Sequence, residues 1–202
     1  DAACRFALEF DQVRISPDDM RVNPQEIRAA YSRINPKTSD ALQESAANIR
    51  RFAQRELPQR FEIKLDGGFA GKRVVPLGSV GIYAPGGTAA YPSSVLMGVI
   101  PAKVAGVARI VVCTPCNSQK ECNPAVLVAA DLAGANEVYR LGGSQAIALM
   151  AYGCRELPRV RKIVGPGNAF VAAAKLEAMA RGLVSIDSPA GPTEVMVIAD
   201  ET

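Results

Sequence analysis

The chain has 202 residues, of which 23 are Lys or Arg and 20 are Asp or Glu, giving a formal net charge of +3. Hydrophobic residues make up 49% of it, enough for a folded core, so a wholly disordered chain is excluded. The near-balanced charge gives no electrostatic basis for nucleic acid or an anionic membrane as main partner. The sequence contains no His, so a Ser-His-Asp triad, a His-ligated zinc ion and an imidazole base cannot be built from it alone.

The two ends of the sequence carry no targeting or membrane signal. No apolar run of about 18 residues is present, and no basic segment followed by an apolar one opens the chain, so we expect neither a membrane span nor a secretory signal. Residues 1–10 already have the pattern of a helix, and residues 194–202 have that of a strand with no element after it. We therefore expect the sequence to be part of a longer protein.

Residues 1–60 are charged and have helical periodicity. Asn23 before Pro24 is typical of a helix start, and we expect a helix from there to about residue 34. The pair at 35–36, Asn-Pro, interrupts it. A longer helix is expected over residues 39–56, with an apolar face that includes Leu42 and Ala46.

Residues 61–84 are expected to be extended, with a glycine turn at 67–68, and from Val80 short apolar strands alternate with helices of small residues. These strands show little polar alternation, which indicates burial on both faces. The order predicts an α/β fold, a Rossmann-like, doubly wound, mostly parallel sheet. We expect residues 1–79 to be the helical and extended part of a first, incomplete α/β domain and residues 80–202 to be the Rossmann-like domain. The expected strands are 80–84, 109–114, 137–141, 161–165, 183–187 and 194–200, and the expected helices lie near 93–106, 124–134, 144–152 and 168–181.

The five cysteines do not form a disulfide framework for a chain of this size, because their number is odd. Cys113 and Cys116 have the C-x-x-C spacing of redox and zinc sites, but no His or second C-x-x-C is present to complete a zinc site. Cys113 ends an apolar strand, where Cys commonly acts as a small hydrophobe. We expect structural thiols in a reducing cytoplasm, and a reactive thiol, a metal site or a disulfide remain the alternatives.

Three expected strands end in glycine-rich turns that lead into helices. The turns are YAPGG after residue 82, GGSQA from residue 142 and GPGNA from residue 165, and each carries one larger polar residue: Tyr83, Gln145 and Asn168. Carboxyl ends of parallel strands share one edge of the sheet, where ligands bind in open α/β folds. Glycines allow close backbone approach, and helix N-termini favour phosphate or carboxylate. None of the turns has the G-x-G-x-x-G pattern, so tight structural turns are the alternative reading.

A fourth segment, residues 187–194, links two expected strands. Pro189 and Pro192 stiffen this loop, which would hold the Thr193 hydroxyl and the Glu194 carboxylate in set positions. A rigid surface connection is an equally good reading of this loop.

Taken together, the four motifs resemble those of the histidinol dehydrogenase family. The matching segments are VGIYAPGG, GGSQAIALMAYG, KIVGPGNAFVAAAK and IDSPAGPTEVMVIAD, in this order and spacing, and the resemblance covers nearly the whole chain. It implies a fold related to aldehyde dehydrogenases and an intertwined homodimer. It also implies oxidation of L-histidinol to L-histidine through the aldehyde, with two NAD and one water, as the last step of histidine biosynthesis.

The resemblance also implies roles for individual residues. NAD contacts fall on Tyr83, Gln145 and Asn168, which makes residues 80–202 the NAD-binding domain, and a substrate-contacting hydroxyl falls on Thr193, where the family more often has Ser. The family's zinc ligands and its Glu-His proton-transfer pair lie beyond the last motif, so no catalytic or metal-binding residue is expected in this chain. Two other functions stay open: a thiol-dependent aldehyde dehydrogenase relative that uses Cys113 or Cys116, and a non-catalytic nucleotide-binding module.

Overall fold

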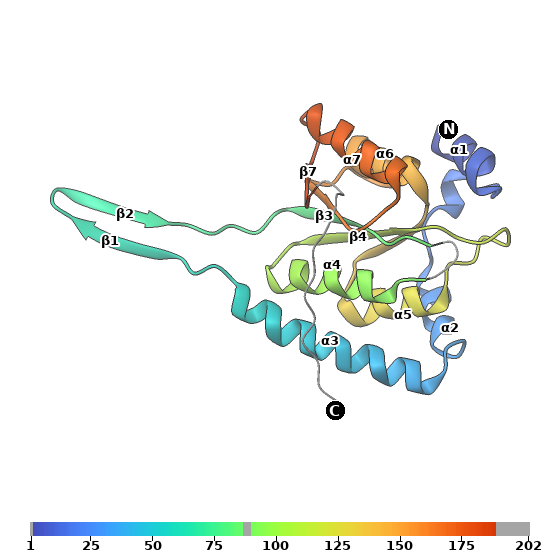
Figure 1. Ribbon diagram of the computed structural model, residues 1–202, viewed down its shortest axis with the longest axis horizontal. Helices are drawn as coiled ribbons and strands as arrows, with labels where there is room; N and C mark the ends of the chain where they lie inside the picture. Colours follow the sequence, from blue (N-terminus) through green and yellow to red (C-terminus); the bar gives the residue numbers. More distant parts are fainter. Residues whose placement is uncertain (1, 87–89, 189–202) are drawn as a thin grey trace.

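A computed structural model describes residues 2–86 and 90–188 of the chain, and in these a parallel sheet of five strands forms the centre (Figure 1). The strand order is β5-β4-β3-β6-β7, and every neighbouring pair is parallel. Because the chain starts in the middle of the sheet and builds outward in both directions, the fold is doubly wound, as expected. The expected strand at 194–200 lies outside the described residues. The strands are β3 (Ser79–Tyr83), β4 (Arg109–Thr114), β5 (Glu137–Arg140), β6 (Lys162–Val164) and β7 (Ser185–Ile186).

Helices cover both faces of the sheet, as Figure 1 shows. Successive strand residues point to opposite faces, so Val112 packs in one core and Val111 and Cys113 in the other. These three side chains are fully buried, and burial of a Val side chain contributes roughly 1.5–3 kcal/mol. The first core lies under α4 (Pro92–Val104) and α5 (Pro124–Ala133), and the second under α6 (Gly143–Tyr152) and α7 (Ala169–Ala180).

The N-terminal helices pack outside these layers. The helix α1 (Ala2–Asp11) contacts α6, α2 (Pro24–Tyr31) contacts α5, and α3 (Pro36–Glu56) contacts α4, while the short 3-10 helix η1 (Pro17–Asp19) lies between α1 and α2. The start of α3 was predicted three residues too late. Pro36 takes the first helical position, where its missing N–H costs nothing, and the Asn35 side chain accepts the N–H of Lys37 at 2.9 Å.

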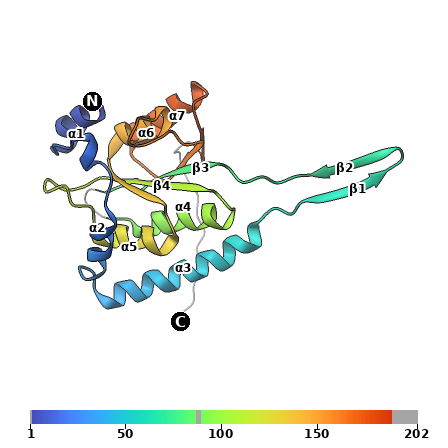
Figure 2. The same cartoon turned by 180° about the vertical axis from the view of Figure 1, so that it is seen from behind.

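A two-stranded hairpin joins α3 to the central sheet. Its strands β1 (Phe61–Leu65) and β2 (Gly68–Lys72) are antiparallel, and the turn lies where the glycines predicted it. The hairpin projects away from the sheet and all its residues are exposed (Figure 2). The division into residues 1–79 and 80–202 stays a prediction. Within the described residues, no helix is both long and apolar enough to cross a membrane.

Candidate functional site

The glycine turns that follow β3, β5 and β6 surround a cavity of about 570 Å³ at the carboxyl edge of the sheet. Tyr83 and Gly86 line it from the end of β3, Pro115 from the loop after β4, Gly142 from the turn after β5, and Asn168 from the turn after β6. The neighbouring strands β3 and β6 mark the point where the chain reverses its direction across the sheet. Open α/β sheets bind ligands at this position.

Tyr83 joins the first turn to the second. Its side chain is buried, and its hydroxyl accepts the N–H of Gly143 at 3.0 Å. Burial raises the pKa of Tyr83, which the hydrogen bond from Gly143 offsets only in part, so the hydroxyl stays protonated at neutral pH. Helix α6 starts beside it from Gly142 with no side-chain cap. Gly142 and Gly143, at the start of this helix, line the cavity. The N-terminus of a helix favours anions, so this end of α6 suits a negatively charged group.

Asn168 lies at the wall of the cavity and caps α7. Its Oδ1 accepts the N–H of Val171 at 3.1 Å, which fixes the orientation of the side-chain amide. The cap uses the oxygen, so the amide NH₂ is the group that Asn168 offers to a ligand.

Gln145 does not line the cavity. Its side chain is buried, and its Nε2 donates to Asp11 Oδ2 at 2.7 Å. Asp11 lines the cavity instead, at the end of α1. Burial raises the pKa of Asp11, and the hydrogen bond from Gln145 lowers it in part. Asp11 could not be identified from the sequence, since a charged residue at the end of a helix gives no sign of a partner 134 residues away.

The third turn is held by an ion pair that no local sequence pattern indicates. Lys175 of α7 is buried, pairs with Asp187, and donates to the carbonyl of Gly165 at 3.1 Å. The N–H of Gly165 donates to Asp187 Oδ2 at 2.9 Å. Burial favours the neutral form of Asp187, but the hydrogen bonds from Lys175 and Gly165 outweigh it and lower the pKa of this carboxyl. The predicted substrate contact, Thr193, lies outside the described residues.

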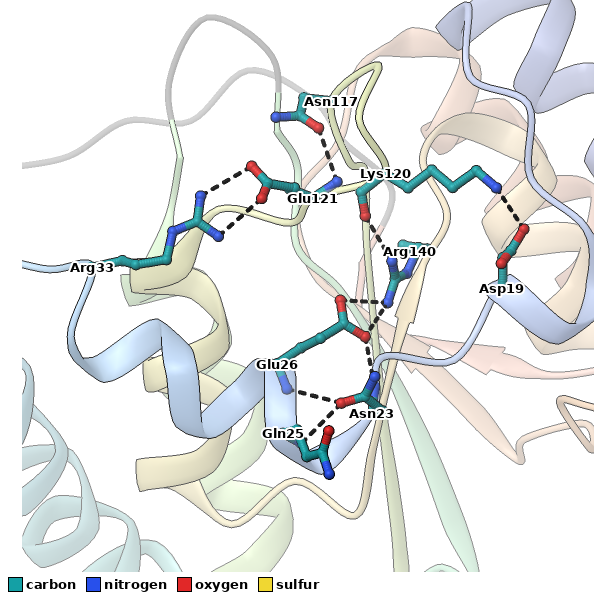
Figure 3. Close-up of polar contacts among 9 residues, drawn as sticks. All are labelled: Asp19, Asn23, Gln25, Glu26, Arg33, Asn117, Lys120, Glu121 and Arg140. Carbon is teal, nitrogen blue, oxygen red and sulfur yellow. Dashed lines mark hydrogen bonds and ion pairs between the residues drawn. The ribbon is translucent and has the colours of Figure 1, made fainter.

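The loop of residues 115–123 forms another wall of the cavity, and the N-terminal segment fixes it from both sides (Figure 3). The Arg33 guanidinium donates to both oxygens of Glu121 at 3.2 and 3.0 Å, and Lys120 pairs with Asp19 at 2.7 Å. Arg140 at the end of β5 donates to the carbonyl of Lys120 at 2.7 Å and pairs with Glu26. This wall therefore depends on charges supplied by residues 19–33.

The pair between Asp19 and Lys120 gives a pH-dependent contribution to stability. The hydrogen bond from Lys120, with further ones from Ser16, lowers the pKa of Asp19 from 3.8 to about 2. A carboxylate with a lowered pKa stabilises the fold above its unfolded-state pKa, and this contribution is lost as the pH falls through the folded-state value. We expect Asp19→Asn to lower the free energy of unfolding by a constant amount above about pH 4, and by progressively less towards pH 2.

Urea unfolding of the wild type and Asp19→Asn across this pH range measures the difference. In a Lys120→Gln background the same substitution should have a much smaller pH-dependent effect, because the largest cause of the shift is gone. A difference between the two proteins that stays constant down to pH 2 would show that the pair is not formed in solution.

A second cavity, of about 960 Å³, lies between the base of the hairpin and α4. Although it is larger, its walls are mainly apolar, including Leu57, Val74, Val75, Leu77 and Met97, and only one of the three glycine turns reaches it. A site that orients a small-molecule ligand needs polar groups that converge on it, and the glycine turns supply them in the 570 Å³ cavity, which is therefore the better candidate.

The described residues hold no group of three His, Cys, Asp or Glu side chains that could hold a metal ion. Burial raises the pKa of Cys113 far above its usual range and also raises the pKa of Cys116. A catalytic thiolate needs a lowered pKa, so the surroundings of both thiols disfavour the thiol-dependent mechanism.

A doubly wound parallel sheet with a polar cavity at its switch point defines a Rossmann-like α/β class of protein. The histidinol dehydrogenase family model matches residues 1–202, and the chain belongs to this family. It is 49% identical to the histidinol dehydrogenase of Methanothermobacter thermautotrophicus. That alignment covers 100% of the chain and 47% of the relative. It is 49% identical to the Listeria monocytogenes enzyme, over 97% of the chain and 45% of the relative.

The crystal structure of histidinol dehydrogenase from Elizabethkingia anophelis has the same fold. It superposes with a TM-score of 0.90 at 37% identity, covering 95% of this chain and 44% of that one. The chain thus spans about half the length of the relatives it matches.

Proposed function

We propose that this chain is the NAD-binding part of an enzyme that oxidises L-histidinol to L-histidine with two NAD, the last step of histidine biosynthesis. The observation that carries the proposal is the polar cavity at the switch point of a chain that belongs to the histidinol dehydrogenase family. The two alternatives from the sequence, a thiol-dependent relative and a non-catalytic module, gain no support from the site.

Tyr83, Asn168 and the N-terminus of α6 are the groups that we propose to hold NAD. The N-terminus of α6, where Gly142 and Gly143 line the cavity, suits the pyrophosphate, while the Tyr83 hydroxyl and the Asn168 amide suit ribose hydroxyls or the carboxamide. Gln145 can make the contact proposed for it only if its side chain leaves Asp11.

Bound NAD would supply the hydride acceptor, and the residues of this chain would hold the NAD in place. The Tyr83–Gly143 hydrogen bond and the Asn168 cap fix two polar groups before a ligand arrives, which reduces the entropy lost on binding. Zinc, the Thr193 contact with substrate, the homodimer and a cytoplasmic location are parts of the same proposal that rest on the family alone. The described residues do not fit a metal ion, so no step is assigned to zinc.

The substitution Asn168→Ala tests the cofactor site. We expect the Kd for NAD to rise about tenfold, the loss of roughly one hydrogen bond, when binding is measured by isothermal titration calorimetry. The same change removes a helix cap, which costs about 1 kcal/mol of stability.

Asn35→Ala is the matched control because Asn35 also caps a helix through Oδ1 and lies outside the cavity. It should cost similar stability and leave the Kd for NAD unchanged. Equal Kd values for the wild type and Asn168→Ala would show that Asn168 does not contact NAD. A protein with no measurable affinity for NAD would contradict the proposed function itself.

A further inference from the structure

Cys116 and Cys122 lie directly opposite each other in the loop that forms one wall of the cavity. They are an antiparallel bridge pair, next to the pair Asn117–Glu121, in which the Asn117 N–H donates to the Glu121 carbonyl at 2.9 Å. The hydrogen bond of the neighbouring pair makes Cys116 and Cys122 the non-hydrogen-bonded pair, whose Cα atoms are typically about 4.5 Å apart. Disulfides join Cα atoms about 4.4–6.8 Å apart, so this position permits one.

The loop is held in the shape that keeps the two cysteines opposed. Lys120 has a left-handed backbone with φ of 63°, and its N–H donates to the Asn117 carbonyl at 2.9 Å, which closes the turn. The Asn117 side chain accepts the N–H groups of Gln119 and Glu121 at 3.0 and 2.8 Å. The ion pairs to Arg33 and Asp19 also hold the tip of the loop in this shape (Figure 3).

The third nearby cysteine is a poorer partner. Cys113 and Cys122 belong to the cores on opposite faces of the sheet, whereas Cys116 packs at the edge of both cores. The C-x-x-C spacing of Cys113 and Cys116 suggests the other pairing, but Cys113 is fully buried in β4.

We propose that Cys116 and Cys122 are a redox-active pair that forms a reversible disulfide in the wall of the cavity. The oxidant is a low-molecular-weight disulfide of the glutathione class. Cys116, the more exposed of the two, reacts through its thiolate, which is the minor form at neutral pH because burial raises its pKa. The thiolate attacks one sulfur of the oxidant, which releases one thiol and leaves a mixed disulfide. Cys122 then attacks the Cys116 sulfur and releases the second thiol. One disulfide is reduced to two thiols while two protein thiols become one disulfide.

A reducing compartment keeps such a pair as a dithiol, and a rise in the oxidant links it. The bond would join both sides of a loop that lines the cavity, so it would lock this wall. The inference concerns the thiols alone and holds whether or not the cavity binds NAD.

Peptide mapping after oxidation tests the pair. The purified protein is incubated with oxidised glutathione in mildly alkaline buffer, where more of each thiol is ionised, and its remaining thiols are blocked before tryptic digestion without reductant. Trypsin cuts after Arg109, Lys120 and Arg140, so Cys116 falls in peptide 110–120 and Cys122 in peptide 121–140. We expect these two peptides to appear joined, and to separate after reduction.

Fragmentation before Pro115 then assigns the link within the wild-type protein, because it separates Cys113 from Cys116. The joined peptides should persist in Cys4→Ser and disappear in Cys116→Ser. Three results would overturn the proposal: a link through Cys113 to Cys122, a peptide 110–120 that is itself about 2 Da lighter from an internal Cys113–Cys116 bond, or glutathione adducts with no joined peptides.

Discussion

Replacement of Gly165 by Ala is expected to lower the free energy of unfolding by about 4 kcal/mol, with backbone strain and steric clash both contributing. Gly165 has a φ of 117°, a conformation that residues with a Cβ rarely adopt. An added Cβ would lie 2.1 Å from the carbonyl oxygen of Tyr83 and 3.0 Å from its carbonyl carbon. Both atoms belong to the backbone, so the clash cannot be relieved by a change of rotamer.

Gly182→Ala is the matched control. Gly182 also has a positive φ, of 68°, but no heavy atom lies within 4 Å of the added Cβ. It should cost only about 1 kcal/mol, the strain of a left-handed backbone without a clash. Urea unfolding of both variants separates the two contributions. If Gly165→Ala lowered the free energy of unfolding no more than Gly182→Ala, the turns after β3 and β6 would not approach each other this closely.

This close approach matters for the site because it joins the turns after β3 and β6. Tyr83 and Asn168 reach the same cavity only when these turns are in contact. A Gly165→Ala protein that still folds should therefore also bind NAD more weakly at the proposed site.

Apolar runs and glycine turns predicted most of this fold from the sequence. The run RIVVCT gave the strand Arg109–Thr114 with its true bounds, because a continuous apolar run before a turn is typical of a strand buried on both faces. The convergence of the glycine turns followed from the parallel order alone. What local pattern could not give is the orientation of a side chain. Gln145 was identified as a polar residue at a turn, but its hydrogen bond to Asp11 depends on how α1 packs against α6.

The buried charged residues could not be predicted from the sequence either, because their burial also depends on how distant segments pack. Lys175 lies among alanines in a helix, where a lysine is ordinarily read as solvent-exposed, and only the return of the chain at Asp187 explains its burial. Arg140 is the last residue of the short strand β5, and its partner Glu26 is 114 residues away.

Glu26→Gln is expected to lower the free energy of unfolding by about 2–3 kcal/mol, because it leaves the charge of Arg140 buried without a counter-ion. Arg140 Nη2 donates to both oxygens of Glu26 at 2.6 and 2.8 Å, and the Arg140 side chain is only 9% exposed. Its Nε is buried with no hydrogen-bond partner among the described residues, so the guanidinium already has one unmet donor. Glu26 is 35% exposed, which places the expected cost below that of a fully buried pair.

A double-mutant cycle isolates the charge effect. Gln keeps the shape of Glu26 and an oxygen that can accept the N–H of Asn23, so most of the helix cap of α2 survives. Adding Arg140→Met removes the stranded charge, and the double variant should regain part of the stability lost in Glu26→Gln. Arg33→Gln, which breaks the exposed pair with Glu121 in the same wall, should have a much smaller effect. Additive losses in the double variant would mean that Glu26 and Arg140 are not coupled, and that the charge of Arg140 is hydrated rather than buried.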